Sequence, residues 1–372
     1  MSDTRSITVG LIGPLPPPSG GMATQTQQLA RLLAAAGIAV ELVQVNRAYR
    51  PAWIGRLRGV RAVFRLLPYT IHLWRGAGRS DLFHVMANSG WAWHLFAAPA
   101  VWIGRLRGIP VIVNYRGGEA EAFLERRSVW VRSTLGRAFA VVVPSAFLER
   151  IFRRFGFATE VVPNIVDASR FHPGPRRAPG RHIVVTRNLE DIYDIPTALE
   201  AFAEIRRAHG DATMTVAGSG PKLADLQALC ENLGIASAVR FTGRLDNEDV
   251  ARLYRDADLV LNPSTVDNMP ISLLEAMASG VPIVSTHVGG IPDLVEDGRT
   301  ALLVPPRDPG AMAAAALRLL SDTEASARLA DAGIQCAARY TWPQVAPRLL
   351  ALYARALGVA SLNLRYMGGA SS

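Results

Sequence analysis

The stretch VDNMPISLLEAMASGVPIVSTHVGG, residues 266–290, places two carboxylates around the start of a helix. Apolar residues at helical spacing predict a helix that begins after Pro270 and ends at Gly280. Asp267 lies just before this helix, and Glu275 lies more than one turn inside it. The runs DLVLNPS before the helix and VPIVSTH after it are short and rich in β-branched residues, which is typical of buried strands. A strand, a helix and a second strand in this order predict a parallel sheet.

The start of this helix suits an anion, and its two carboxylates suit hydroxyl groups. The first amides of an α-helix have no partner inside the helix and lie at its positive end, so the amides of Ile271 and Ser272 are available to an anionic ligand. Carboxylates repel phosphate but accept hydrogen bonds from sugar hydroxyls. The pattern therefore fits a site for a sugar joined to a diphosphate.

Strand-like runs alternate with helical segments along the whole chain, which predicts an α/β fold. A segment rich in Pro, Gly and Arg at 163–181 is typical of an interdomain linker. We therefore expect two doubly wound, Rossmann-like domains with parallel sheets that face each other across a cleft and bind ligands at the carboxyl ends of their strands. The expected domains are 1–165 and 166–340, with a helix in 341–372 that packs back on the first domain. The expected strands lie at 6–13, 38–45, 82–88, 109–115, 140–145, 161–166, 182–188, 213–218, 239–243, 258–264, 281–287 and 301–306.

The composition excludes several classes of protein. The 372 residues carry a net charge of +9, and 49% of them are hydrophobic, as in a globular protein. Cys230 and Cys336 are the two cysteines and form no CxxC pair, which argues against a disulfide framework and a zinc site. No apolar run reaches about 20 residues and the start MSDTRSIT lacks the layout of a signal peptide, so we expect a cytoplasmic protein. The basic excess lies mainly in the first 180 residues without a nucleic-acid-binding motif, which favours a phosphate-bearing substrate or an anionic membrane over nucleic acid.

The run DNMPISLLEAMASGVPIVSTHVGGIPDLV resembles the signature of glycosyltransferase family 4, whose members are retaining transferases of GT-B fold. The family motif is Glu-x7-Glu, and here it reads Asp-x7-Glu. The resemblance implies that Glu275 binds the ribose hydroxyls of a nucleotide-sugar and that Asp267 binds hydroxyls of the donor sugar. It also implies contacts to sugar and phosphate, largely through the backbone, from Asn268, Met269, Pro270, Ile271 and Ser272.

Other segments extend the resemblance along the chain. PPPSGGMATQTQQLARLLAAAG is similar to the family's first loop and helix, where Gly20 and Gly21 would let the backbone approach the donor phosphates. GSGPKLADLQALC and VRFTGRL resemble segments of the family's second domain, and YTWPQVAPRLLALY resembles its closing helix. The loop at Gly20 is not a GxGxxG fingerprint, so a dinucleotide site is not expected.

Two positions depart from the family pattern. Arg187 matches the arginine that contacts the donor diphosphate, but the lysine expected about five residues later falls near Tyr193 and is absent. Arg116 stands where the family often has a histidine, so it either holds an anionic acceptor or phosphate or is a surface arginine in a glycine-rich loop. His84, at the carboxyl end of an expected strand, is a further candidate to face the substrate. No metal-binding motif is present, and we expect neither a metal nor a cofactor.

The resemblance implies a hexosyltransferase that moves a sugar from a UDP- or GDP-linked donor to an acceptor hydroxyl with retention of configuration. The expected acceptor is a lipid-linked glycan or a precursor of a bacterial cell-surface polysaccharide. Two alternatives stay open. One is a nucleotide-sugar epimerase of the same fold, and the other is a catalytically weak, nucleotide-sugar-binding partner of another transferase.

Residues 51–75 form a segment of a different kind, in which apolar residues are separated by arginines up to a break expected near Pro68. Such a helix can lie in the interface of an anionic membrane, which would make the protein peripheral on the inner face of the cytoplasmic membrane. The alternative is a domain helix whose apolar stripe faces the core. The segment opens with WIGRLRG, which recurs at 102–108 inside an expected crossover helix, where we interpret it as scaffold. The residues of the segment concerned are Trp53, Ile54, Leu57, Val60, Phe64 and Leu67, with Arg56, Arg58, Arg61 and Arg65 largely between them.

Overall fold

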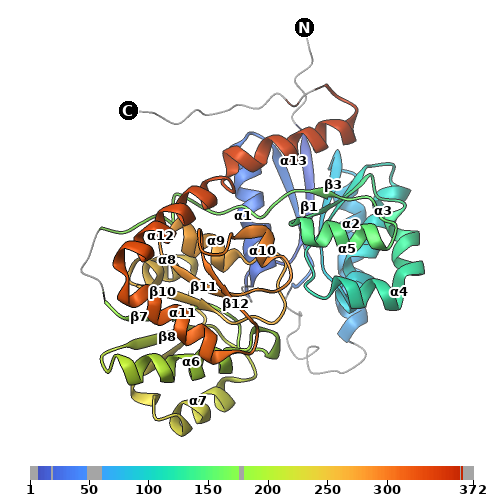
Figure 1. Cartoon of the computed structure of the whole chain (residues 1–372). Helices are drawn as coiled ribbons and strands as arrows, with labels where there is room; N and C mark the ends of the chain where they lie inside the picture. Colours follow the sequence, from blue (N-terminus) through green and yellow to red (C-terminus); the bar gives the residue numbers. More distant parts are fainter. Residues whose placement is uncertain (1–6, 18–19, 48–60, 176–179, 361, 363–372) are drawn as a thin grey trace. The chain divides into compact units, whose positions relative to one another are not determined.

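The structure of the chain, a computed structural model, describes residues 7–17, 20–47, 61–175, 180–360 and 362. The side chains at 61–63 and 127–128 lie outside this description. The chain forms two compact units, one made of Met1–Pro163 together with Ala346–Ser372 and the other of Asn164–Val345 (Figure 1).

The first unit is built on a six-stranded sheet in the order β2-β1-β3-β4-β5-β6, and its neighbouring strands are parallel. The first five strands lie within runs that the sequence indicates, whereas β6 is only two residues long and overlaps the expected run 161–166 at Val161 alone. The strands are β1 (Thr8–Gly13), β2 (Ala39–Gln44), β3 (Leu82–Ala87), β4 (Val111–Tyr115), β5 (Ala140–Val143) and β6 (Glu160–Val161). The helices are α1 (Gly21–Ala35), α2 (Arg61–Ala77), α3 (Ala98–Leu106), α4 (Ala120–Leu135) and α5 (Ala146–Arg154), and α13 (Trp342–Leu357) supplies its last part, from Ala346 on.

The second unit has a parallel six-stranded sheet in the order β12-β11-β10-β7-β8-β9. The chain runs outward in one direction from β7 and in the other from β10, so the order reverses between these two neighbouring strands. The strands are β7 (His182–Val185), β8 (Thr213–Ala217), β9 (Val239–Gly243), β10 (Leu259–Asn262), β11 (Ile283–Thr286) and β12 (Leu302–Val304). The helices are α6 (Ile195–Ala208), α7 (Leu223–Asn232), α8 (Asn247–Arg255), α9 (Ile271–Ala278), α10 (Ile291–Leu294), α11 (Pro309–Ser321) and α12 (Thr323–Ala338).

Both faces of the second sheet are buried. Ile183 and Val185 of β7 pack in one apolar cluster with α6, α7 and α11, whereas Val184 packs in a second cluster with α8, α9 and α12. Successive side chains of a strand point to opposite faces, so a strand covered on both sides must be apolar throughout. This explains why the strands read as continuous apolar runs, and it confirms the predicted α/β class with doubly wound parallel sheets.

Helix α2 differs from its prediction at one point. It continues through Pro68, where the sequence suggested a break. Pro68 is exposed, so the carbonyl that loses its helical hydrogen bond there can be satisfied by water. Residues 48–60, with Trp53, Ile54, Arg56, Leu57, Arg58 and Val60, lie outside the described residues.

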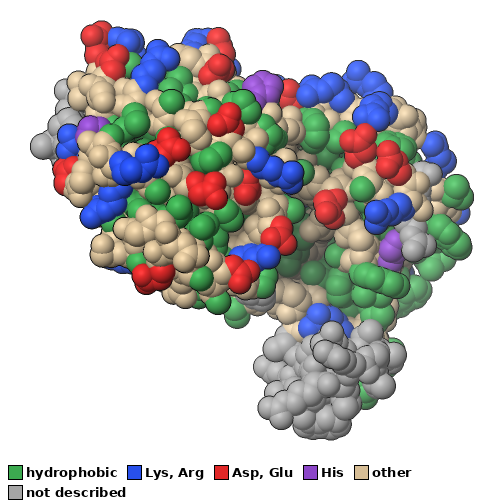
Figure 2. All heavy atoms as spheres, turned by 60° about the horizontal axis from the view of Figure 1, so that its bottom comes forward, with side chains coloured by type: hydrophobic (Ala, Val, Ile, Leu, Met, Phe, Trp, Pro, Cys, Tyr) green, Lys and Arg blue, Asp and Glu red, His purple; other side chains and the backbone are tan. Residues whose placement is uncertain are grey.

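Hydrophobic side chains gather over one area of the first unit in the view of Figure 2, whereas acidic and basic side chains are interspersed over the second unit. Within the described ranges, no helix has the length and apolar character needed to cross a membrane.

Candidate functional site

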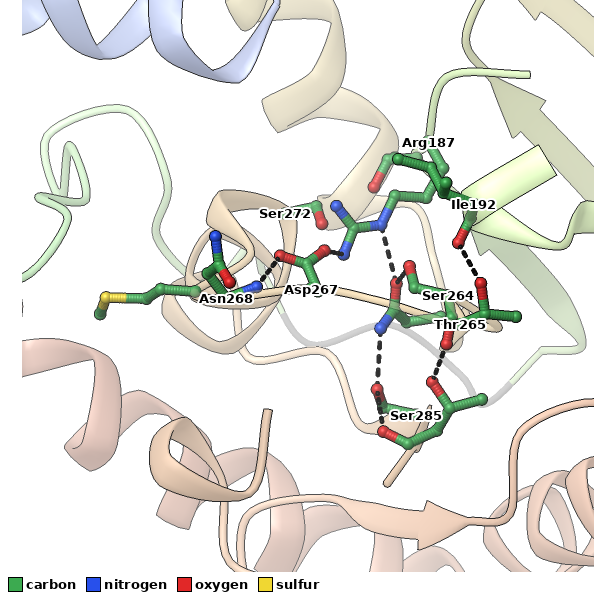
Figure 3. Close-up of polar contacts among 12 residues, drawn as sticks. Arg187, Ile192, Ser264, Thr265, Asp267, Asn268, Ser272 and Ser285 are labelled. Atoms are coloured by element: carbon green, nitrogen blue, oxygen red, sulfur yellow. Dashed lines mark hydrogen bonds and ion pairs between the residues drawn. The ribbon is translucent and has the colours of Figure 1, made fainter. Parts of the chain in front are cut away.

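Two neighbouring strands of the second sheet place Arg187 beside Asn262. Arg187 follows the end of β7, and Asn262 is the last residue of β10. The two strands are paired side by side, so their carboxyl ends meet at the same edge of the sheet. The Arg187 Nε donates a 2.7 Å hydrogen bond to Asn262 Oδ1 (Figure 3). This point, where the strand order reverses, is the place at which open α/β sheets bind their ligands.

Arg187 also forms an ion pair with Asp267. Its Nη2 lies 2.7 Å from Asp267 Oδ2, and the two side chains are only 11% and 15% exposed. The other carboxylate oxygen of Asp267 accepts a hydrogen bond from the Asn268 amide at 2.8 Å. Burial raises the pKa of Asp267, and the guanidinium of Arg187 acts in the opposite direction. The guanidinium has five N–H donors, so these two bonds leave others for a ligand.

A buried polar network fixes Asn262 from below. Its Nδ2 donates to Ser285 Oγ at 2.8 Å, and its Oδ1 also accepts from Ser264 Oγ at 3.0 Å. Thr286 Oγ1 donates to the Ser264 carbonyl at 2.5 Å. The amide of Asn262 therefore has one orientation, with its oxygen toward Arg187. Sequence reasoning missed this network, although a polar Asn-Pro-Ser end on an apolar strand is the signal that marks it.

The loop after β7 places Tyr193 against Arg187, at the position where the family lysine is missing. The Tyr193 ring centre lies 5.2 Å from Arg187 Cζ, within cation–π range. Thr265 holds this loop, because its amide and its hydroxyl both donate to the Ile192 carbonyl, at 2.9 and 3.0 Å. The ring of Tyr193 thus contacts Arg187 at the position where the family pattern has a second cation, the lysine.

Helix α9 begins next to Asp267, as the sequence predicts. The first hydrogen bonds into Pro270 come from Leu273 and Leu274, so among the described residues the amides of Ile271 and Ser272 find no acceptor. The hydroxyl of Ser272 is buried and likewise has no partner in the part of the chain that the structure describes. Three donors therefore lie together at the positive end of a helix.

Glu275 lies one turn further along α9 and is half-buried. Burial raises its pKa to about 8, although Arg187 and Arg170 pull in the opposite direction. A carboxyl group with such a pKa is mostly protonated at neutral pH until a ligand or a cation favours its charged form.

Glycines bring two loops into contact with the residues of this cluster. A Cβ on Gly290 would lie 1.9 Å from the Asn268 carbonyl oxygen, and one on Gly289, whose φ is +55°, would lie 2.0 Å from that of Asp267. A Cβ on Gly218 would lie 1.8 Å from the Arg187 carbonyl oxygen. Side chains cannot be accommodated at such distances, so these glycines are required for the loops to approach each other.

Met269 is part of the scaffold. Its side chain is buried. The side-chain Nδ2 of Asn164 donates to the Met269 carbonyl at 2.7 Å, and the backbone amide of Asn164 donates to the Met269 sulfur at 3.3 Å. Asn268 is also buried and lies beside Asp267 in Figure 3.

The other predicted residues belong to the first unit. Gly20 and Gly21 lie at the start of α1, and an added Cβ at either would meet no atom within 4 Å. Arg116 follows β4, and its Nε donates to Asn114 Oδ1 at 3.1 Å. Burial lowers the pKa of Arg116 to about 10.

His84 lies in the interior of the first unit. It is fully buried, and its ring nitrogens contact Asn114 Nδ2 at 3.0 Å and the Tyr353 hydroxyl at 2.8 Å. Burial, with a smaller contribution from the charge of Arg116, lowers the pKa of His84 to about 3. The imidazole is therefore neutral and serves to hold Asn114, which in turn contacts Arg116.

The structure thus brings Arg187, Asp267, Glu275 and the start of α9 together in the second unit, and His84 and Arg116 together in the first. Within the described residues, no group of three His, Cys, Asp or Glu side chains is arranged to hold a metal ion.

Two family profiles match this chain. "Glycosyltransferase Family 4" matches residues 19–170, and "Glycosyl transferases group 1" matches residues 180–322. The chain belongs to glycosyltransferase family 4. The Asp-x7-Glu sequence and the cluster around it lie within the second of these matches.

Curated relatives of this family 4 protein include a glycogen synthase of Mycobacterium tuberculosis, 29% identical over 279 residues. That match covers 70% of this chain and 66% of the relative. A D-inositol 3-phosphate glycosyltransferase of Corynebacterium urealyticum is 34% identical over 214 residues, which are 52% of this chain and 50% of the relative. The chain therefore spans between half and about two thirds of the length of these relatives.

Solved structures show the same GT-B fold. The sucrose-phosphate synthase of Thermosynechococcus elongatus superposes with a TM-score of 0.76 at 20% identity, covering 95% of this chain and 99% of that one. Anabaena HepE in complex with UDP superposes with a TM-score of 0.72 at 18% identity, covering 94% of this chain and 100% of that one.

Proposed function

We propose that this family 4 protein is a glycosyltransferase that moves a hexosyl group from a UDP- or GDP-sugar to an acceptor hydroxyl with retention of configuration. The observation that carries the proposal is the cluster of Arg187, Asp267 and Asn262 at the point where the strand order reverses, beside the start of α9. It combines a cation, unpaired helix amides and carboxylates, which are the groups that a sugar diphosphate needs. The relatives named as glycosyltransferases and the UDP complex of HepE support it.

In this proposal Arg187 and the amides of Ile271 and Ser272 stabilise the diphosphate as it leaves the sugar. The transition state resembles an oxocarbenium ion. A contact that forms only in such a state contributes about 3–4 kcal/mol to lowering the barrier. Asp267 accepts hydrogen bonds from the donor sugar, and Glu275 accepts them from the ribose. In this proposal no residue acts as a nucleophile, and the leaving phosphate itself takes the proton of the acceptor.

The first unit is proposed to contribute Gly20 and Gly21 to the donor phosphates and Arg116 to an anionic acceptor. The acceptor is proposed to be a lipid-linked glycan or a precursor of a cell-surface polysaccharide. The protein would then work as a peripheral protein on the inner face of the cytoplasmic membrane, with residues 51–75 at the bilayer. No metal or cofactor takes part in the proposed reaction, because arginine and helix amides supply the positive charge.

The test is transfer from a panel of UDP- and GDP-sugars to a lipid extract, with and without excess EDTA. We expect a product with the wild type in both conditions, and less than a hundredth of it with Glu275→Ala. Glu231→Ala, which removes an exposed carboxylate from α7, is the matched control and should transfer normally. Near-normal transfer by folded Glu275→Ala, or conversion of the donor to an epimer without acceptor, would contradict the proposal.

A further inference from the structure

Helix α2 exposes an apolar stripe along its length. Phe64, Leu67, Ile71 and Trp74 are spaced by three or four residues, so they share one face of the helix. Their exposed fractions are 49%, 60%, 42% and 48%. Tyr69 and Leu73, on the other side, are buried in the core. Helix α2 therefore packs on the core through its other face, and the stripe lies at the surface of the unit.

Helix α3 continues this apolar surface with the second WIGRLRG segment. Gly104 faces inward, where an added Cβ would lie 2.3 Å from Val111 Cγ2, and in this respect the segment is scaffold as predicted. Trp102 and Leu106, one turn apart, point outward and are 39% and 71% exposed. One helix thus combines a scaffold face with an exposed aromatic and aliphatic face, and α3 packs against α2.

Arginine side chains lie on the exposed tryptophans. Arg107 Cζ, just after α3, lies 4.8 Å from the ring centre of Trp74 on α2. Arg137 Cζ, just after α4, lies 3.9 Å from the ring centre of Trp102. The first contact joins the exposed face of α2 to the end of α3, which packs against it, and the second joins α3 to the end of α4. We define the α2–α3 surface as Phe64, Leu67, Ile71, Trp74, Trp102 and Leu106 with Arg75, Arg105 and Arg107.

The charge of this region is mainly positive, although Arg79 forms an ion pair with Glu41 of β2. Residues 61–118 contain seven arginines and a single carboxylate, Asp81, which accepts a hydrogen bond from the Thr8 amide. A protein partner would need a matched acidic surface, whereas a bilayer that contains anionic lipid supplies both the negative charge and an apolar layer beneath it. Tryptophan and arginine side chains both favour the headgroup region, where one end of the side chain is wet and the other apolar.

We propose that the α2–α3 surface docks on an anionic lipid bilayer, with its apolar side chains in the headgroup boundary and its arginines on lipid phosphates. This assigns a membrane contact to α3, which the sequence alone indicated only as scaffold. The inference deepens the proposed function, because a docked enzyme would meet a lipid-linked acceptor. Its test requires neither donor nor acceptor, so it can fail or succeed independently of sugar transfer.

The experiment is co-sedimentation of the full chain with vesicles of phosphatidylcholine alone or with about 30% phosphatidylglycerol, in about 0.1 M salt, where charges still act over about 10 Å. We expect the wild type to bind the anionic vesicles and not the neutral ones. Arg75→Glu with Arg105→Glu should lower the binding constant by about thirtyfold or more. Leu67→Ser with Ile71→Ser should weaken binding to the same vesicles without changing the net charge.

The matched control is Arg207→Glu with Arg318→Glu, which makes the same change of net charge on exposed residues of α6 and α11 in the second unit. We expect this variant to keep most of the binding. Equal losses in the control and in the Arg75 and Arg105 variant would show that binding follows total charge, and absence of wild-type binding to anionic vesicles would also overturn the proposal. Thermal unfolding of each variant identifies any that fails to fold, and the serine and glutamate pairs test the surface independently of each other.

Discussion

Arg187 is already ion-paired with a carboxylate, that of Asp267, before any ligand binds. The 2.7 Å pair with Asp267 is largely shielded from water, so a diphosphate must share the guanidinium with an acid that repels it. The bond from Nε to Asn262 keeps the guanidinium in place while its other donors exchange partners. Tyr193 supports one side of the guanidinium and adds no charge of its own.

This geometry predicts opposite effects at the two ends of the pair. Arg187→Ala should weaken binding of UDP, or GDP, by about tenfold to a hundredfold and of the nucleoside by much less, because a hydrogen bond to a charged group contributes about 1.5–3 kcal/mol. Asp267→Asn should bind the nucleoside diphosphate at least as tightly as the wild type, since a competing charge is gone, yet lose sugar transfer. Asp267→Glu should retain part of the transfer. Calorimetry with the diphosphate and the nucleoside measures the affinities.

Equal losses for nucleotide and nucleoside in Arg187→Ala would remove Arg187 from the phosphates. A lower affinity of Asp267→Asn for the nucleoside diphosphate would mean that Asp267 serves only to orient Arg187.

The raised pKa of Glu275 predicts that the protein releases a proton when the nucleotide binds. Burial raises its pKa to about 8, above the value of 4.5 for an unperturbed Glu, so at pH 7 the carboxyl is mostly protonated in the free protein. Accepting hydrogen bonds from ribose hydroxyls favours the ionised form and lowers that pKa. Binding at pH 7 should therefore release up to one proton, and affinity should rise as the pH rises toward 8.

Calorimetry of UDP binding in two buffers with different ionisation enthalpies measures this release. Glu275→Gln is the matched control, because it keeps the shape and cannot ionise. If wild type and Glu275→Gln show the same dependence on buffer, Glu275 does not change its protonation when the nucleotide binds, which would contradict this prediction.

At this scale the sequence predicted the relative positions of residues that depend on helix spacing, while their roles stay predictions. Asp267, Glu275 and the start of α9 lie within one local stretch, so their relation follows from helix geometry. The network of Asn262, Ser264 and Ser285 depends on which strands become neighbours, and a single strand cannot indicate that. His84 shows the same limit, because its partner Tyr353 is 269 positions away in the sequence.

At the scale of elements, the central strands such as β3, β4 and β10 were predictable because they are buried along their whole length, whereas the edge strands β2, β6 and β9 carry exposed and charged residues. The glycine loops were not predictable, because a close approach between backbones leaves no apolar pattern. Gly218 and Gly290 bring the loops after β8 and β11 against the backbones of Arg187 and Asn268. The absence of side chains at these positions therefore lets the two loops lie against the cluster.

We expect Gly218→Ala and Gly290→Ala each to lose most nucleotide binding, because a Cβ less than 2 Å from a carbonyl oxygen forces the loops apart. Gly210→Ala is the matched control, since an added Cβ there meets no atom within 4 Å. Calorimetry with the same nucleotide compares the three variants. Unchanged affinity in Gly290→Ala would show that the loop after β11 can move away without disturbing Asp267.

At the scale of the whole molecule, the last helix completes a core that the first half of the chain begins. Asn114 turns its amide nitrogen toward His84, because its oxygen accepts from Arg116. The Nε2 of the neutral His84 ring must then accept, so Nδ1 carries the hydrogen and donates it to the Tyr353 hydroxyl.

Tyr353→Phe should leave this N–H buried without a partner and destabilise the first unit by about 1–3 kcal/mol. In a unit of this size each kcal/mol lowers the melting temperature by about 2–4 °C. Tyr193→Phe removes a hydroxyl that has no hydrogen bond within the described residues, so it should melt like the wild type. Thermal unfolding followed by circular dichroism compares them, and equal melting of the two variants would mean that His84 finds another acceptor.

The division of the first unit into Met1–Pro163 and Ala346–Ser372 also affects the order of events during synthesis. While the ribosome is still translating the second unit, the nascent first unit lacks the helix that supplies Tyr353. Domains that are continuous in sequence can fold as they emerge, whereas this one has to wait for its last segment. The second unit, continuous from Asn164 to Val345, is therefore expected to reach its native state first, although it is made later.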